Sequence, residues 1–110
     1  MERKKELTSD NCLYIITLMI KRFRHRGLER LYKNDDRRGI NAEYVEKVRR
    51  ILAQLKSASQ PDDMDIPGFK LHPLKQNLSG FWSVTVNANW RIIFRFEDGD
   101  VTDVDLIDYH

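Results

Sequence analysis

The stretch FWSVTVNANWRIIFRFEDGDVTDVDLIDYH, residues 81–110, decides the fold because hydrophobic and polar side chains alternate along it. A period of two is typical of strands with one buried face. In FWSVTV the hydrophobic positions are Trp82, Val84 and Val86, NAN turns the chain, and WRIIFRF alternates again. EDGD contains the hairpin signal Asp98-Gly99, and VTDVDLI follows as the last strand. This stretch predicts an antiparallel meander.

The same stretch also predicts a register. If NAN is a tight turn and EDGD joins the last two strands, Trp90 and Arg91 begin one strand beside the end of the next. That end is Ile107, which leads into the closing DYH. We therefore expect Arg91 to lie near the end of the chain. His72 and Lys75 are two strands further over, so only twist and curling of the sheet would bring them close.

Upstream of the meander the chain predicts a strand and two helices. LYIITLMIKRF, residues 13–23, is rich in β-branched and aromatic residues and predicts a first strand. HRGLERLYKND has hydrophobic residues three and four apart, which indicates a short helix. NAEYVEKVRRILAQLKSA offers Asn41 as an N-cap and Glu43 in the first turn. Its hydrophobic stripe predicts a helix of about four turns and consists of Val45, Val48, Leu52 and Leu55.

A loop and an edge strand complete the predicted α+β domain. SASQPDDMDIPG has the composition of a loop. FKLHPL reads as a short strand, and Pro73 restricts it to an edge or a bulge. We expect a single domain with helices covering one face of an antiparallel sheet.

Charge is unevenly distributed along the chain. The 110 residues carry a net charge of +2, but residues 1–60 contain 15 Lys and Arg against 8 Asp and Glu, whereas residues 61–110 contain 4 against 9. A basic half suits an anionic partner such as nucleic acid, although a solvated helix surface carries similar charges. We expect the following basic residues to bind RNA: Lys21, Arg22, Arg24, Arg26, Arg49 and Arg50.

Cysteine content and hydropathy favour a cytoplasmic protein. A single cysteine, Cys12, excludes an internal disulfide framework and a cysteine-rich zinc site. The longest apolar run, CLYIITLMI, falls far short of the ~20 residues that span a bilayer. No small-residue cleavage site follows it, so we expect neither an export signal nor a membrane anchor.

Candidate catalytic residues emerge by elimination. The three histidines have no metal-ligand spacing, and neither a glycine-rich phosphate loop nor a Gly-x-Ser-x-Gly motif is present. The remaining polar residues on strands or their ends are His72, Lys75, Arg91, Asp108, Tyr109 and His110. These types suit the cleavage of RNA through its own 2′-hydroxyl, which needs a base, an acid and cations on the phosphate, but no cofactor.

Each candidate also has an ordinary structural interpretation. His72 could be a strand residue on the polar face, and Lys75 a loop charge. Arg91 could cover the sheet with its aliphatic stem, and Tyr109 could anchor the tail in the core. Composition and periodicity alone do not choose between these interpretations and catalysis.

Three blocks of the chain resemble a known family. MIKRFRHRGLERLY, LHPLK and GFWSVTVNANWRIIFRFEDGDVTDVDLIDYH occur in the order and spacing of the HigB-type toxins of the RelE/ParE superfamily, over residues 19–110. The resemblance implies a bacterial type II toxin that cleaves mRNA on the ribosome without a metal. It also implies a helix-turn-helix antitoxin, HigA, and a toxin–antitoxin heterotetramer.

The resemblance assigns roles to individual residues. Family function maps onto His72 and onto Asp108, Tyr109 and His110, while Lys75 and Arg91 occupy matching places. On this basis the two histidines exchange protons, Asp108 orients one of them or assists as base, and Lys75 with Arg91 stabilises the phosphate. Tyr109 would position the nucleotide.

The chain departs from the family pattern at two places. The family usually reads HPLKG, whereas the fifth residue here is Gln76. If the loop needs a positive φ there, glutamine costs about 1 kcal/mol and displaces Lys75. Family members also commonly start at the equivalent of Met19, so we interpret residues 1–18 as an added segment or as upstream sequence translated from an early start codon.

Two other functions remain open at this point. The superfamily includes ParE-type gyrase poisons, which would not need the histidines or the DYH ending. The chain could also be an inactive toxin-like fold that acts as a corepressor with its antitoxin, and Gln76 is the feature that favours this alternative.

Overall fold

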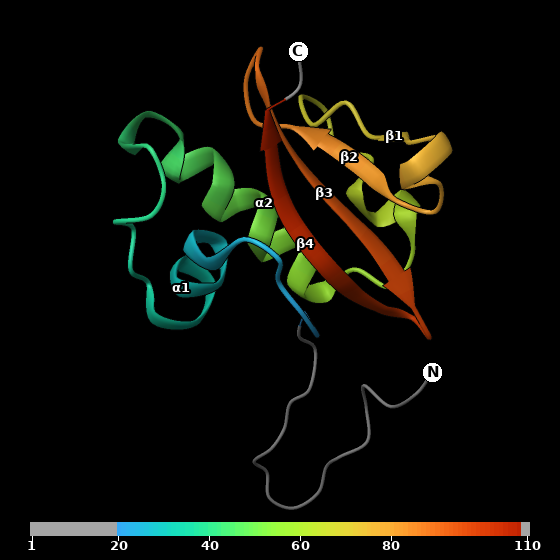
Figure 1. Ribbon diagram of the computed structural model, residues 1–110, viewed down its shortest axis with the longest axis horizontal. Coiled ribbons are helices and arrows are strands. Elements are labelled where there is room, and N and C mark those ends of the chain that lie inside the picture. Colours follow the sequence, from blue (N-terminus) through green and yellow to red (C-terminus); the bar gives the residue numbers. More distant parts are fainter. Residues whose placement is uncertain (1–19, 109–110) are drawn as a thin grey trace, which may run out of the picture.

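Four antiparallel strands follow one another across the sheet in the order of the sequence. The computed structural model describes residues 20–108, and the strands within them are β1 (His72–Pro73), β2 (Trp82–Thr85), β3 (Trp90–Glu97) and β4 (Asp100–Asp108). Figure 1 shows the long, twisted pair β3 and β4, with β1 at the opposite edge of the sheet. The predicted meander is confirmed.

Short polar turns set the register of this sheet. Asp98 and Gly99 both adopt a positive φ, of +56° and +83°, and Glu97 pairs with Asp100 on either side of them. This is the backbone that a two-residue hairpin requires. In the NAN turn the side-chain oxygen of Asn87 accepts hydrogen bonds from the backbone N–H groups of Asn89 and Trp90, both at 2.9 Å.

Two helices precede the sheet at the predicted places. Helix α1 (Arg26–Asn34) begins after His25, whose Nδ1 accepts a hydrogen bond from the backbone N–H of Leu28. Asn41 caps a 3-10 turn, Ala42–Tyr44, which leads directly into α2 (Val45–Ser57). The predicted hydrophobic stripe of α2 is buried, together with Ile51.

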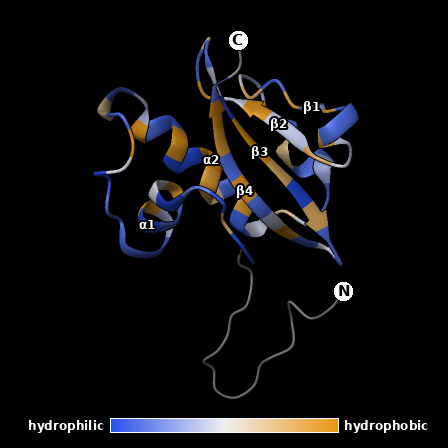
Figure 2. Ribbon diagram, viewed as in Figure 1, coloured by the Kyte–Doolittle hydropathy of each residue, from blue (hydrophilic) through white to orange (hydrophobic). Residues whose placement is uncertain are grey.

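The helices pack against one face of the sheet to form the core. Figure 2 shows hydrophobic and hydrophilic segments along β3 and β4. Ile92, Ile93 and Phe94 follow one another in β3 and are each at most 2% exposed, so the centre of the sheet is buried on both faces and strict alternation does not hold there. The sheet contributes alternate residues to this core, and α1 and α2 contribute Leu28, Leu31 and the stripe of α2. The buried core positions on the three longer strands are Val84, Ile92, Phe94, Val101 and Val104.

The segment before α1 runs along β4. Its backbone makes three hydrogen bonds: Lys21 N–H to Val101 O, Val104 N–H to Arg22 O, and Arg24 N–H to Val104 O. The pairing is parallel, and only Phe23 forms a β-bridge, with Val104. The rest of the predicted first strand, residues 13–19, lies outside the described residues.

The predicted edge strand is short. β1 contains only two residues, and Pro73, which has no N–H to donate, lies at the outer edge of the sheet. A 3-10 turn, Gln76–Leu78, follows β1 and returns the chain to β2.

Candidate functional site

The sheet face opposite the helices carries two of the six candidate residues, His72 and Arg91. Residues that pair across neighbouring strands point to the same face of the sheet, and so does every second residue along one strand. The strand pairing therefore assigns each side chain to a face. We call the side without helices the open face. It comprises His72, Ser83, Thr85, Arg91, Ile93, Arg95, Asp105 and Ile107.

His72 and Arg91 lie on this open face, in neighbouring rows. His72 pairs with Ser83, which pairs with Ile93 on β3, and Arg91 lies two residues before Ile93. Their backbones are therefore separated by about 7 Å along the strands and about 10 Å across them. Both side chains are half-buried. The sheet thus brings these two predicted site residues to one surface.

Lys75 lies in the turn that follows β1. Its carbonyl accepts a hydrogen bond from the Leu78 N–H, and its side chain is exposed. The next residue, Gln76, has φ of +57°. The position that the family pattern fills with glycine therefore adopts a positive φ here, which was the condition for expecting strain at Gln76.

The end of β4 lies beside Arg91, as the turns predicted. Arg91 pairs with Ile107, and Trp90 pairs with Asp108. This register places Asp108 on the helix side of the sheet, opposite to the face of Arg91. Tyr109 and His110 lie outside the described residues.

Two hydroxyl groups between the candidate residues were missed by sequence reasoning. Ser83 is fully buried, and its Oγ, like the Oγ1 of Thr85, has no hydrogen-bond partner within residues 20–108. Ser83 pairs with His72, and Thr85 pairs with Arg91. Buried polar atoms without partners are uncommon in folded proteins, and they suit the binding of a polar ligand or water. The signal was present in FWSVTV, where both occupy the positions between hydrophobic residues.

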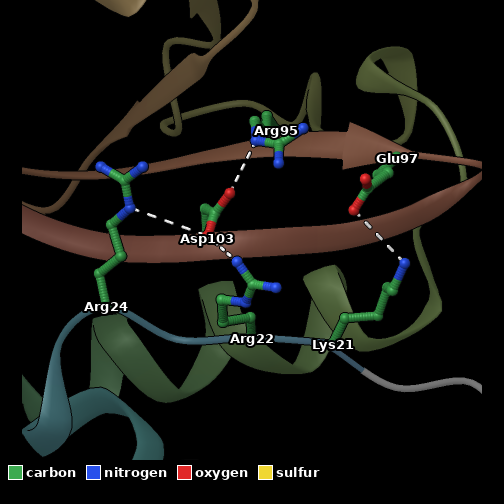
Figure 3. A network of polar contacts seen from close by, with 6 residues as sticks. All are labelled: Lys21, Arg22, Arg24, Arg95, Glu97 and Asp103. Carbon is green, nitrogen blue, oxygen red and sulfur yellow. Dashed lines mark hydrogen bonds and ion pairs between the residues drawn. The ribbon is translucent and has the colours of Figure 1, made fainter.

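The predicted RNA-binding residues separate into two groups. Lys21, Arg22 and Arg24 lie on the segment beside β4, and exposed Arg26 begins α1. Figure 3 shows Arg22 and Arg24 directed towards one acidic side chain on β4, whereas Lys21 pairs with Glu97 at 3.4 Å.

Arg49 and Arg50 lie elsewhere, at a pocket between α1 and α2. The pocket has a volume of about 460 Å³, and Leu31 and Leu52 contribute to its lining. Arg49 donates to Asp35 at 2.7 Å across it. These two arginines thus belong to a different structural element from Lys21, Arg22 and Arg24.

The described part of the chain contains neither a metal-ligand cluster nor a membrane-spanning helix. Between Ile20 and Asp108 no cluster of His, Cys, Asp and Glu side chains has the geometry of a metal site. None of the helices there has the length and hydropathy to cross a bilayer.

Comparison with known proteins identifies the family. Residues 21–110 match the family described as the RelE-like toxin of the type II toxin–antitoxin system HigB. The chain belongs to this HigB-like toxin family. It is 39% identical over 92 residues to "Endoribonuclease HigB" of Proteus vulgaris, a match that covers 84% of this chain and 100% of the relative. It is 34% identical over 79 residues to "Toxin HigB-1" of Vibrio cholerae, covering 70% of this chain and 83% of the relative.

Solved structures agree with the fold of a HigB-like toxin. The "YoeB-YefM complex from Staphylococcus aureus" contains a chain that matches with a TM-score of 0.54 at 24% identity, over 86% of this chain and 99% of that one. YafQ from E. coli matches with a TM-score of 0.51 at 14% identity, over 84% and 93%. The α+β architecture predicted from the helical and alternating patterns of the sequence is therefore confirmed.

Proposed function

We propose that this HigB-like toxin is an endoribonuclease that cleaves mRNA on the ribosome and thereby inhibits translation. The observation that carries the proposal is the 39% identity to "Endoribonuclease HigB", which extends over the whole length of that relative. The open face supports it, because His72 and Arg91 lie there beside two buried hydroxyls that have no hydrogen-bond partner among residues 20–108.

The chemistry uses the 2′-hydroxyl of the RNA as nucleophile. A base removes its proton, the oxygen attacks the adjacent phosphorus, and an acid protonates the departing 5′-oxygen. His72 and His110 take these proton-transfer roles, because an imidazole ring can both accept and donate a proton. Arg91 and Lys75 stabilise the charge that develops on the phosphate.

The residues at the chain end support these groups. Tyr109 stacks on the nucleotide whose phosphate is attacked, as aromatic residues do on unpaired RNA bases. Because the register places Asp108 on the helix side, we assign it to orienting the tail and its histidine. No step needs a metal or another cofactor.

The partners follow from the family. A HigA-type helix-turn-helix antitoxin binds and silences the toxin, and two toxins with two antitoxins form a heterotetramer. The basic residues Arg22, Arg24, Arg26, Arg49 and Arg50, with Lys21, dock the toxin on ribosomal RNA, where phosphate contacts give affinity without sequence preference. A protein that acts on ribosomes works in the cytoplasm.

A second candidate function rests on Gln76. Its left-handed backbone is a conformation that glutamine adopts at a cost, and the residue directly follows Lys75. If that cost displaces Lys75, the protein would be an inactive toxin fold that serves as a corepressor with its antitoxin.

Toeprinting on translating ribosomes tests the proposal. The protein should cut mRNA in the ribosomal A site, and His72→Ala and His110→Ala should each reduce the cutting rate by about 100-fold or more, the contribution of general acid–base catalysis. Lys33→Ala is the control: its exposed ammonium pairs with Glu29 within α1, and the variant should cut normally.

Three outcomes would contradict this assignment. Full cutting by either histidine variant would remove that histidine from the mechanism. Inhibition of supercoiling without cuts would favour a gyrase poison. Antitoxin binding with neither activity would favour the corepressor.

A further inference from the structure

The open face carries a second charged site, centred on a buried acid. Ile93 pairs with Asp105, but Arg95 pairs with Thr102, so β4 has one more residue than β3 between these pairs. Asp103 lies in this bulge with φ of +55° and is 4% exposed. A bulge redirects a side chain relative to its neighbours in the strand. Here it presents a carboxylate beside Arg95.

Three arginines from two elements surround that carboxylate. Arg95 Nε donates to Asp103 Oδ2 at 2.7 Å, while Arg22 NH1 and Arg24 Nε lie 3.7 and 3.8 Å from Oδ1. Figure 3 shows Arg95 reaching over from β3 and the other two rising from the segment beside β4. We call these three residues the arginine cluster.

One carboxylate cannot neutralise three guanidinium groups. The cluster keeps two positive charges in excess, and within residues 20–108 its members pair with no other acid. The Asp103 side chain is 5% exposed, whereas those of Arg22 and Arg24 are 70% and 49% exposed. The acid is thus enclosed and the cations face solvent.

The cluster is also held in place before any ligand binds. Arg95 is hydrogen-bonded to Asp103, and the guanidinium of Arg24, an ion-pair partner of Asp103 at 3.8 Å, lies 5.2 Å from the centre of the buried Phe81 ring. A guanidinium that is already oriented loses less entropy on binding an anion. Its remaining N–H groups form the planar fork that matches two phosphate oxygens.

Arg95 connects this cluster to the candidate catalytic residues. Arg91, Ile93 and Arg95 are alternate residues of β3, so they share the open face. Arg95 lies about 14 Å from Arg91 along the strand. Arg91 and the arginine cluster therefore lie on the same side of the sheet, which is the arrangement that one nucleic-acid strand contacting both of them needs.

We propose that the arginine cluster binds a backbone phosphate of the mRNA strand that is being cleaved, away from the cleaved bond. This inference rests on the proposed nuclease function. It adds Arg95 as a binding residue and Asp103 as the acid that holds the cluster together. Arg22 and Arg24 then bind the mRNA strand that is cleaved, in addition to any contact with ribosomal RNA.

Salt-dependent RNA binding tests the cluster. The probe is a short fluorescein-labelled single-stranded RNA, and the protein carries His110→Ala so that the RNA stays intact. Adding Arg22→Gln and Arg24→Gln should weaken binding about tenfold, the size of one exposed charge-assisted hydrogen bond. The slope of log affinity against log salt should fall by roughly 0.7 for each phosphate that the variant no longer neutralises.

A matched control removes the same charge elsewhere. Arg37 and Arg38 lie between α1 and α2, pair with Glu46 and Asp36, and are exposed. The double variant Arg37→Gln, Arg38→Gln should keep the affinity and the salt slope. Urea unfolding of both double variants should give midpoints close to the parent, which separates weaker binding from lower stability.

Three results would overturn the proposal: unchanged affinity in the Arg22, Arg24 double variant, an equal loss in the control, or no salt-dependent binding by the parent. The proposal would also be overturned if the Arg22, Arg24 double variant bound the short RNA normally but no longer cosedimented with ribosomes. The phosphate partner of the cluster would then be ribosomal RNA. The nuclease function is judged separately by the histidine variants, whose A-site cuts do not depend on this result.

Discussion

A single residue, Gln76, shows how a departure from a family pattern acquires a physical meaning. The sequence predicts backbone strain at Gln76 if the loop needs a positive φ there. Gln76 has φ of +57°, which confirms that the loop needs a positive φ at this position. For residues other than glycine the left-handed region costs about 1–2 kcal/mol, because Cβ approaches the following carbonyl. Gln76 is exposed, so its side chain offers little packing to offset that cost.

Replacing Gln76 by glycine should therefore stabilise the protein. We expect Gln76→Gly to raise the free energy of unfolding by about 0.5–1 kcal/mol, since the relief of strain exceeds the extra entropy of glycine in the unfolded chain. Urea denaturation measures it. The control is Asn77→Gly in the same 3-10 turn, where φ is not positive. That variant should be destabilised, and an equal effect of both changes would refute the strain argument.

At the scale of elements, the sequence indicated most of the strands and helices. The turns predicted the pairing of Arg91 with Ile107 because each hairpin connection has few backbone solutions. The bulge at Asp103 was not predicted, although the spacing of the hydrophobic residues in the sequence indicates it. Val101 and Val104 are both buried in the core but three residues apart, which breaks the period of two in VTDVDLI. Strict alternation was assumed there, so the extra residue was overlooked.

The start of α1 depends on a close backbone approach. A Cβ on Gly27 would lie 2.7 Å from the carbonyl oxygen of Gly39, and a Cβ on Gly39 would lie 2.7 Å from the Cα of Gly27. These are backbone atoms, so no side-chain rotation relieves the clash. The pair joins α1 to the loop that leads into α2. Two glycines scattered in the sequence thus share one packing role.

Gly27→Ala should accordingly destabilise the protein although alanine favours helices. The propensity gain is about 1 kcal/mol, but overpacking against backbone costs about 1–3 kcal/mol. We expect a net loss, seen as a lower melting temperature. Arg26→Ala, at the neighbouring exposed position, should leave the melting temperature nearly unchanged. If the Gly27→Ala protein melted at the same temperature as the parent, α1 and the loop that contains Gly39 would be able to move apart without a loss of stability.

At the scale of the whole molecule, the site depends on how the strands are combined. His72 and Arg91 share a face because two antiparallel pairings connect them, and this follows only once every register is known. Their distance depends on twist, which local patterns do not encode. The basic residues illustrate the same limit: Arg49 and Arg50 line a pocket between α1 and α2, whereas Arg22 and Arg24 pair with Asp103 on β4, although charge counting grouped them. The roles of Tyr109 and His110 stay predictions.

The first 18 residues should be dispensable for folding, because the segment directly after them is already anchored in the core and on β4. Ile20 is 5% exposed within the core, Lys21 and Arg24 hydrogen-bond to β4, and the family match begins at residue 21.

A chain that starts at Met19 should keep its free energy of unfolding within about 0.5 kcal/mol, as for changes away from packed regions. A chain that starts at His25 loses the burial of Ile20, about 1.5–3 kcal/mol, and exposes the edge of β4. Urea unfolding of both chains decides: a destabilised Met19 chain would show that residues 1–18 support the fold, and a stable His25 chain would show that the segment beside β4 does not.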